Sequence, residues 1–256
     1  MTGLRWLTTV AGAAMLLAMS GYASAADQAS ERSVAAAVAS KARLADNRKL
    51  DEGRHPAEVL SFAAVERGST IADLLAGNGY YSEMLADLVG PKGTVIPMNT
   101  PGFHKAESWA LLQKAHPNLT PMVRAAPGMS LAPASVDMIF THLVYHDLYW
   151  ESEKYKFPRL DVDAMVANWY RALRPGGTVI VIDHAGPGGD TRALVDKLHR
   201  IDPAVVRADM ERAGFVLDGE SDALHVAGDD HSKNVFDPAV RGKTDRFMLR
   251  FRKPAA

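Results

Sequence analysis

Short apolar runs alternate with helical patterns along most of the chain. Seven runs have the length and apolar character of β-strands; the first begins at residue 70, and the others lie at 94–99, 122–125, 135–140, 178–183, 215–218 and 246–252. Between them, apolar residues recur every three or four positions, which predicts helices at 56–63, 82–89, 103–115, 162–173 and 203–213. Strands that alternate with helices predict an α/β fold with a mostly parallel sheet.

The last predicted strands indicate how the sheet ends. The run at 178–183 is apolar at almost every position, as expected for a central parallel strand. In the run at 246–252, Phe247, Leu249 and Phe251 occupy alternate positions, and a long loop separates this run from the one at 215–218. A long hairpin of this kind adds an antiparallel strand to the sheet.

A glycine-containing turn follows the first predicted strand. The stretch that begins at Thr70 runs through Asp73 into a turn with Gly77 and Gly79, and a helical pattern starts directly afterwards. Glycine has no Cβ and accepts a positive φ, so the backbone of such a turn can approach a ligand closely. The following helix points its free N–H groups at the same crevice. The turn therefore predicts a binding site for a small molecule with a polar end.

The first 25 residues have the features of a secretory leader. Arg5 is the only charged residue before Asp27, an apolar run covers 7–19, and the small residues at 23–25 suit a signal peptidase. The run is shorter than the ~20 residues of a membrane span. We expect cleavage near Ala25 and a periplasmic or secreted protein; an uncleaved N-terminal anchor is the alternative. The predicted organisation is a leader (1–25), an N-terminal extension with a helix (26–50) and one domain (51–256).

Composition and charge exclude some classes of partner. The chain has 29 Lys and Arg against 30 Asp and Glu, and it has no cysteine. Without a basic excess, the phosphate neutralisation that drives nucleic-acid binding has no evident source. Without cysteine, the chain has no disulfide and no thiolate metal ligand, so it can enter an oxidising compartment unchanged. We expect a small-molecule substrate, no nucleic-acid partner and no stable membrane insertion after cleavage; the oligomeric state is left open.

Three stretches resemble the class I S-adenosylmethionine-dependent methyltransferase superfamily: the acidic and glycine-containing turn at 73–79, the strand Asp-Met-Ile-Phe at 137–140, and Leu-Arg-Pro-Gly-Gly at 173–177. Over roughly residues 50–253, the chain also resembles a group of exported bacterial proteins described as predicted methyltransferases. The stretches that carry this second resemblance are 54–56, 79–81, 145–147, 199–202 and 237–246. The resemblance implies a Rossmann-like, doubly wound sheet of seven strands with an antiparallel last strand.

The same resemblance implies that S-adenosylmethionine is the cofactor. Asp73, Gly77 and Gly79 would line its methionine end, where a carboxylate suits the cofactor's ammonium group. The residues expected to contact the cofactor are Asp73, Gly77, Gly79, Tyr80, Asn99 and Thr141. For Tyr80 and its neighbour Tyr81, packing at a helix start is the alternative role.

Two positions depart from the superfamily pattern. Leu75 stands where the first glycine of the motif is usual, which narrows the turn. Asn99 stands at the end of the second strand, where an acidic residue usually accepts hydrogen bonds from both ribose hydroxyls. An amide oxygen accepts hydrogen bonds but lacks charge assistance. These departures predict a weaker cofactor interaction or a different ligand.

Polar residues gather after the fourth and fifth predicted strands, where ligands bind in open α/β sheets. His146, Tyr145 and His184 are the catalytic candidates. The candidates for substrate contact are Arg54, His55, His142, Asp147, His199 and Arg200. Three interpretations stay open. His146 is a general base; or His142 and His146, four residues apart on a helical turn, bind a divalent metal with His184 or Asp147; or the histidines only shape the crevice.

The segment 228–246 is a long charged loop, either a lid over the site or an exposed excursion. Taken together, the patterns and the resemblance predict a methyltransferase that acts on an oxygen or nitrogen of a small molecule. The alternative is an exported binding protein, or an enzyme of another class, that retains the methyltransferase sheet.

Overall fold

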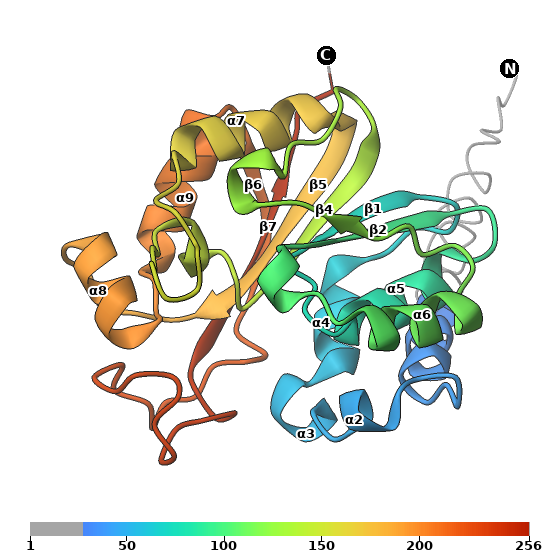
Figure 1. Cartoon of the computed structure of the whole chain (residues 1–256), viewed down its shortest axis with the longest axis horizontal. Helices are drawn as coiled ribbons and strands as arrows, with labels where there is room; N and C mark the ends of the chain where they lie inside the picture. Colours follow the sequence, from blue (N-terminus) through green and yellow to red (C-terminus); the bar gives the residue numbers. More distant parts are fainter. Residues whose placement is uncertain (1–27, 256) are drawn as a thin grey trace, which may run out of the picture.

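The computed structural model describes residues 28–255 and contains one seven-stranded sheet with the order β3-β2-β1-β4-β5-β7-β6 (Figure 1). The strands are β1 (Thr70–Leu74), β2 (Thr94–Asn99), β3 (Met122–Val123), β4 (Val136–His142), β5 (Leu173–His184), β6 (Val216–Ser221) and β7 (Arg246–Arg252). The pairs from β3 to β5 are parallel, and β7 runs antiparallel to both β5 and β6. The predicted α/β sheet and its antiparallel last strand are confirmed.

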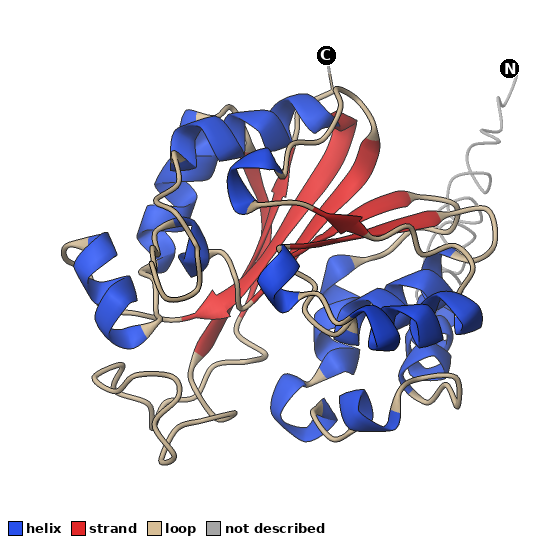
Figure 2. Cartoon of the chain, in the orientation of Figure 1, coloured by secondary structure: helices blue, strands red, loops and turns tan. Residues whose placement is uncertain are grey.

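Helices connect the strands and cover both faces of the sheet (Figure 2). They are a helix over 28–38, α2 (Ala45–Arg48), α3 (Asp51–Arg54), α4 (Pro56–Ala63), α5 (Tyr80–Val89), α6 (Ala106–Ala115), α7 (Val162–Ala172), α8 (Thr191–Leu198) and α9 (Pro203–Arg212). Three 3-10 turns are η1 (Pro101–Phe103), η2 (Ala126–Gly128) and η3 (His146–Leu148).

Two hydrophobic cores lie on the two faces of the sheet. Side chains of α7 and α9 pack on one face, and side chains of α4, α5 and α6 pack on the other. Strand β5 shows why a run without polar residues is needed: Val179 and Val181 enter the first core, whereas Ile180 and Ile182 enter the second. Because both faces are covered, successive residues of a central strand are all buried. The sheet therefore holds the residues at the carboxyl ends of its strands in fixed positions.

Most predicted elements agree with the structure, and the differences have local causes. Asp202 caps α9 by accepting from the N–H of Ala204, with proline at the first helical position, as predicted. The strand predicted at 122–125 is only Met122–Val123, at the sheet edge. The turn at 173–177 was expected to precede the fifth strand, but β5 already pairs with β4 at Leu173 and then shifts register, with Gly176 at φ 81°. Helix α8 was not predicted.

The N-terminal extension is tied to the domain by a buried ionic contact. The Nε of Arg43 donates to Glu83 of α5 at 2.9 Å, and its terminal nitrogens donate to Asp51 at 2.8 and 2.7 Å. Val34 and Ala37 enter the core below α5. The predicted leader at 1–25 lies outside the described residues. Among the helices of residues 28–255, none combines the length and the apolar composition that crossing a membrane requires.

Candidate functional site

The turn after β1 has the conformation that its glycines were expected to provide, and one non-glycine residue shares it. Leu75, Gly77 and Gly79 all have positive φ, at 48°, 57° and 75°. An added Cβ on Gly79 would come within 2.5 Å of the Leu112 side chain, so this glycine allows α6 to pack against the turn. Leu75 adopts the left-handed conformation with a full side chain, which costs about 1–2 kcal/mol.

Asn99 holds the glycine turn through both ends of its side-chain amide. The amide oxygen accepts from the N–H of Gly77 at 2.8 Å, and the amide nitrogen donates to the Gly77 carbonyl at 3.1 Å. The indole N–H of Trp109 donates to the same carbonyl at 3.2 Å. In this arrangement the Asn99 side chain is occupied by the backbone of the turn. Its predicted contact with ribose hydroxyls would compete with these bonds.

A cavity of about 270 Å³ opens beside this turn at the carboxyl ends of β1 and β4. Helix α3 and its neighbours form one wall, and the start of α5 forms another. The polar and aromatic side chains that line it are Asn47, Arg54, Asp73, Asn78, Tyr80, Tyr81 and His142. A Cβ added to Gly77 would meet nothing within 4 Å, so the backbone of the turn is open to a ligand here. The cavity coincides with the site predicted from the turn.

Opposite charges face this cavity. Asp73 is 4% exposed and accepts a hydrogen bond of 2.5 Å from Ser82. Burial raises the pKa of Asp73 to about 7, against the opposing effects of Ser82 and of the Arg54 charge. The Arg54 guanidinium lies 4.4 Å from the centre of the Tyr80 ring, and burial lowers its pKa. Tyr80 donates to Asp51 at 2.6 Å, which fixes that ring.

His142, the last residue of β4, also faces the cavity. Its ring lies 4.5 Å from the Tyr81 ring, and its Nε2 is buried without a hydrogen-bond partner among residues 28–255. Burial and, less strongly, the charge of Arg54 hold its pKa well below the ordinary value, so the ring is neutral. An unsatisfied buried nitrogen at a cavity wall is a polar contact available to a ligand.

The predicted helical pairing of His142 with His146 is wrong. His142 ends a strand, Leu143 turns the chain at φ 59°, and His146 begins the 3-10 turn η3. The two histidines therefore do not share a helical face, and His142 belongs to the cavity described above. The metal site that combined these two side chains is not formed.

His146 is held by Asp183 at the end of β5. Its Nδ1 and the Asp183 carboxylate are 2.8 Å apart, and the other carboxylate oxygen accepts from the His146 backbone N–H at 2.8 Å. Burial lowers the pKa of His146, but Asp183 and Asp147 outweigh it and raise the value to about 9. Without a ligand, the ring therefore carries a proton at neutral pH. This charge state does not suit the general base that was one interpretation of His146.

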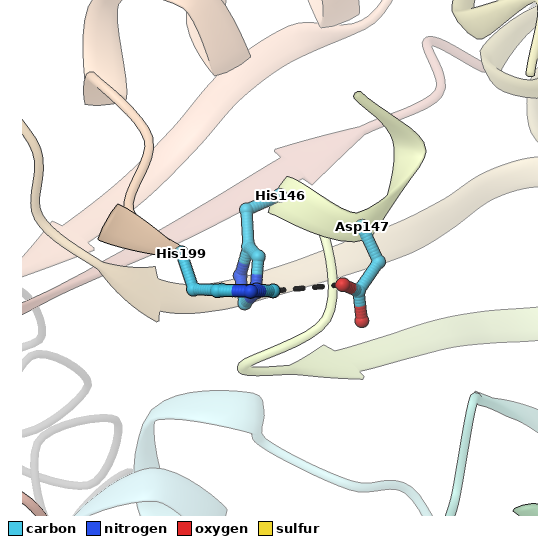
Figure 3. A group of neighbouring side chains, drawn as sticks. All are labelled: His146, Asp147 and His199. Atoms are coloured by element: carbon cyan, nitrogen blue, oxygen red, sulfur yellow. Dashed lines mark ion pairs between the residues drawn. The ribbon is translucent and has the colours of Figure 1, made fainter. Parts of the chain in front are cut away.

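Asp147 and His199 complete a compact group with His146. One ligand atom from each of the three side chains lies within 4.8 Å of the others, and the three side chains point toward one another (Figure 3). The Nε2 of His146 is 3.6 Å from the Asp147 carboxylate. Burial raises the pKa of Asp147 to about 6, and burial lowers that of His199. The fold thus brings His199, which is distant in sequence, to the adjacent pair His146 and Asp147.

His184 lies beside this group and has a different partner. Its ring centre is 5.9 Å from that of His146, and its Nδ1 is 2.7 Å from the hydroxyl of Thr244. Burial lowers the pKa of His184 to about 3, so the ring is neutral. The contact joins the end of β5 to the loop that precedes β7.

Four predicted site residues do not reach a common site. Tyr145 is fully buried and donates to Asp209 at 3.0 Å, away from His146, so its predicted catalytic role is wrong. The hydroxyl of Thr141 donates to the carbonyl of Ile180 inside the sheet and is not available to a cofactor. His55 is exposed at the start of α4 and pairs loosely with Glu58. None of these side chains lines the cavity.

Arg200 is the fourth, and it holds the long loop instead of a substrate. It is completely buried and donates to the carbonyls of Lys233 and Ala185 at 2.8 and 3.0 Å and to the Asp229 carboxylate at 3.0 Å. This loop, drawn in red near α8 and the end of β5 in Figure 1, lacks helices and strands. Phe236 of the loop packs on His199 with a ring separation of 5.1 Å. The loop thus lies against the histidine group.

Two contributors to the site were not assigned a role from the sequence. Asp183 orients His146, and Ser82 is the hydroxyl partner of Asp73. The position of Asp183 at the carboxyl end of an apolar strand was a usable signal, because polar residues there face the crevice. Ser82 gave none, since a serine in the first turn of a helix is common.

Comparison with known families and solved structures agrees with this fold. Residues 72–181 match a family model described as a methyltransferase domain. A crystal structure of a SAM-dependent methyltransferase from Aquifex aeolicus is 21% identical, with a TM-score of 0.56, over 81% of this chain and 97% of that one. An S-adenosylmethionine-dependent methyltransferase from Mesorhizobium loti is 16% identical, with a TM-score of 0.55, over 79% and 99%. No curated protein is similar enough to be matched.

The chain therefore has the Rossmann-like fold of class I methyltransferases. Residues 72–181 are thus similar to a methyltransferase domain, which supports S-adenosylmethionine as the cofactor, and the solved structures share the fold. The resemblance to the exported group stays a prediction.

Proposed function

We propose that the protein is an S-adenosylmethionine-dependent methyltransferase that acts on an oxygen or nitrogen of a small molecule. The observation that carries this proposal is the cavity at the glycine turn, where the Arg54 guanidinium and the Asp73 carboxyl group face one space. An amino acid end with one ammonium and one carboxylate group is complementary to that pair. The domain match over the same turn supports this choice of ligand.

The residues of the cavity suit the methionine end of the cofactor. Asp73 would accept from the ammonium group, and Arg54 would donate to the carboxylate. The open backbone at Gly77 and the unsatisfied His142 nitrogen provide further polar contacts. When bound, S-adenosylmethionine supplies an electrophilic methyl group. The chain's own contribution is to fix the donor and to exclude water, because positioning is a large part of such catalysis.

The acceptor would lie at the same sheet edge, toward η3 and the end of β5. His146, Asp147 and His199 converge there, and Trp150 and Phe236 pack on the His199 ring. As the new bond to carbon forms and the bond from sulfur to carbon breaks, a neutral acceptor releases one proton. Asp147 and His199 are the side chains of this group that can receive it, because His146 already carries a proton at neutral pH.

Calorimetric titration of the folded protein, from residue 26 onward, with S-adenosylmethionine and S-adenosylhomocysteine tests the proposal. We expect one cofactor molecule per chain, with a Kd in the micromolar range. If millimolar cofactor gives no heat with protein whose fold has been verified by circular dichroism, the proposal is wrong.

Two observations favour a second candidate, a protein that uses the same sheet for another ligand. Leu75 fills the place of the usual glycine, and the Asn99 amide is engaged by the turn itself. Both features reduce the backbone and side-chain contacts that the glycine turn offers to a nucleoside cofactor. The titration above separates the two candidates.

Leu75→Gly should tighten cofactor binding about threefold to tenfold. Glycine adopts the observed φ without strain, and removing the side chain gives access to backbone groups whose hydrogen bonds contribute about 0.5–1.5 kcal/mol each. Leu75→Ala is the matched control, because it removes most of the side chain but keeps a Cβ at positive φ. The measurement is calorimetric Kd for both variants. Unchanged or weaker binding by the glycine variant would favour the second candidate.

We also propose that residues 1–25 direct export. The support is the composition of that segment alone, with one charge, an apolar run and small residues at 23–25. N-terminal sequencing of the protein recovered from a periplasmic fraction should begin near Ala26. Recovery of the intact N-terminus in the cytoplasm would contradict this.

A further inference from the structure

We propose that His146, Asp147 and His199 bind one divalent transition-metal ion, for which Zn²⁺ is the probe. In the described part of the chain, these three side chains each offer one possible ligand atom, and the three atoms all lie within 4.8 Å of one another. The histidines come from η3 and from the end of α8, so the fold, and no local motif, assembles the group (Figure 3).

His146 is already oriented as a metal ligand. Its Nδ1 is bound to Asp183, and the same aspartate accepts from the His146 backbone N–H. This leaves Nε2 directed to the space shared with Asp147, at 3.6 Å from that carboxylate. A histidine ligand usually donates its second ring nitrogen to a carboxylate, which fixes the tautomer and raises the basicity of the nitrogen that binds.

His199 is also held in place. It ends α8 in the left-handed conformation at φ 50°, with its backbone N–H bonded to Val195. Trp150 packs on its ring at 5.5 Å and Phe236 packs at 5.1 Å. These contacts restrict the imidazole before any ion arrives, so little ordering is needed when it binds.

The donor set indicates the class of ion. Two imidazoles and one carboxylate suit Zn²⁺ or Fe²⁺, whereas Mg²⁺ and Ca²⁺ prefer oxygen ligands. Three protein ligands leave at least one coordination position open, as in catalytic metal sites. An ion here would be placed to hold an acceptor oxygen or nitrogen at the sheet edge. Metal binding itself does not depend on the proposed methyl transfer, since the three ligands are separate from the lining of the cofactor cavity.

A second histidine pair provides a matched control. His225 and His231 lie 3.0 and 2.8 Å from the two oxygens of Asp245. That carboxylate also accepts from the N–H of Val226, and each of its oxygens is already bonded to one histidine. The two imidazoles thus bracket the carboxylate rather than facing a common space with it. We therefore expect His231→Ala to leave metal affinity unchanged.

The test is titration of metal-free protein, without a polyhistidine tag, with Zn²⁺ by calorimetry. We expect one equivalent to bind, at least 100-fold weaker binding in His199→Asn, and about 10–100-fold weaker binding in Asp183→Asn, which alters only the orienting partner. Asparagine tolerates the left-handed conformation of position 199. Asp147→Asn, at a partly exposed position, serves as a second ligand variant if His199→Asn does not fold.

Three results would overturn the proposal: no Zn²⁺ binding by folded protein, full affinity in both ligand variants, or loss of binding in His231→Ala. Titration with Co²⁺ in place of Zn²⁺ is an independent measurement. The visible absorption of Co²⁺ should change when it binds to the wild-type protein, and this change should be absent with Asp147→Asn. A failure here leaves cofactor titration unaffected, so the two proposals fail separately.

Discussion

Arg200→Ala should destabilise the protein by about 3–5 kcal/mol, the cost expected when one partner of a buried ion pair is removed. The substitution leaves the carboxylate of Asp229 buried without its cation and frees the carbonyls of Lys233 and Ala185. Since domains are stable by only about 5–15 kcal/mol, this is a large share of the total. Urea unfolding monitored by circular dichroism measures the difference.

The effect should be concentrated in the loop between β6 and β7. Asp229 also accepts from the backbone N–H of Asp245, so the ion pair connects Arg200, between α8 and α9, to two separate points of this loop. Hydrogen exchange of residues 222–245 should rise more than that of the sheet. Phe236 belongs to the same loop and packs on His199.

Arg207→Ala is the matched control for this experiment. Arg207 pairs with Glu220 at the protein surface, and exposed pairs contribute about 0–1 kcal/mol. A loss below about 1 kcal/mol in Arg200→Ala, equal to that of the control, would show that the buried pair does not hold the loop. The double variant Arg200→Met, Asp229→Asn should be more stable than Arg200→Ala, because it leaves no unpaired charge buried.

The sequence predicted most of the strands and helices, but fewer of the contacts at the site. The strands were predictable because burial on both faces imposes unbroken apolar runs such as 178–183, and the Asp202–Pro203 pair has a local physical meaning as a helix start. Helix α8 was missed although Asp190 caps it, because the helix is only eight residues long and amphipathic over little more than two turns.

The site was predictable only as far as local geometry determines it. The glycine turn and the gathering of polar residues at one sheet edge follow from strand order. The directions of neighbouring side chains do not: Tyr145 points into the core at Asp209, whereas His146 points to Asp183. The contact of His146 with His199 and the burial of Arg200 depend on how the long loop packs. No spacing in the sequence encodes those contacts.

Asp73→Asn should weaken S-adenosylmethionine binding about 10–100-fold and remove its dependence on pH below about 7. In the free protein, burial raises the pKa of Asp73 to about 7. Only the ionised carboxylate gives the ammonium group a charge-assisted hydrogen bond, worth about 1.5–3 kcal/mol. Wild-type affinity should therefore fall about tenfold per pH unit below 7, and should fall again above about 8, where an α-amino group loses its proton.

The same substitution should stabilise the protein without cofactor at pH 8. The folded-state pKa of Asp73 lies above the value of about 3.9 expected in the unfolded chain, so the folded state holds the proton more tightly. Wild-type stability then falls as pH rises from about 4 to 7, and asparagine, which can still accept from Ser82, avoids this loss. Thermal unfolding at pH 5 and pH 8 measures the difference.

Ser82→Ala is the control, because it removes the hydroxyl partner of Asp73 but keeps the buried carboxylate. Weaker binding without a gain in stability would mean that the Asp73 carboxylate is already ionised in the free protein. The residues around the cavity would then stabilise that negative charge before the cofactor binds.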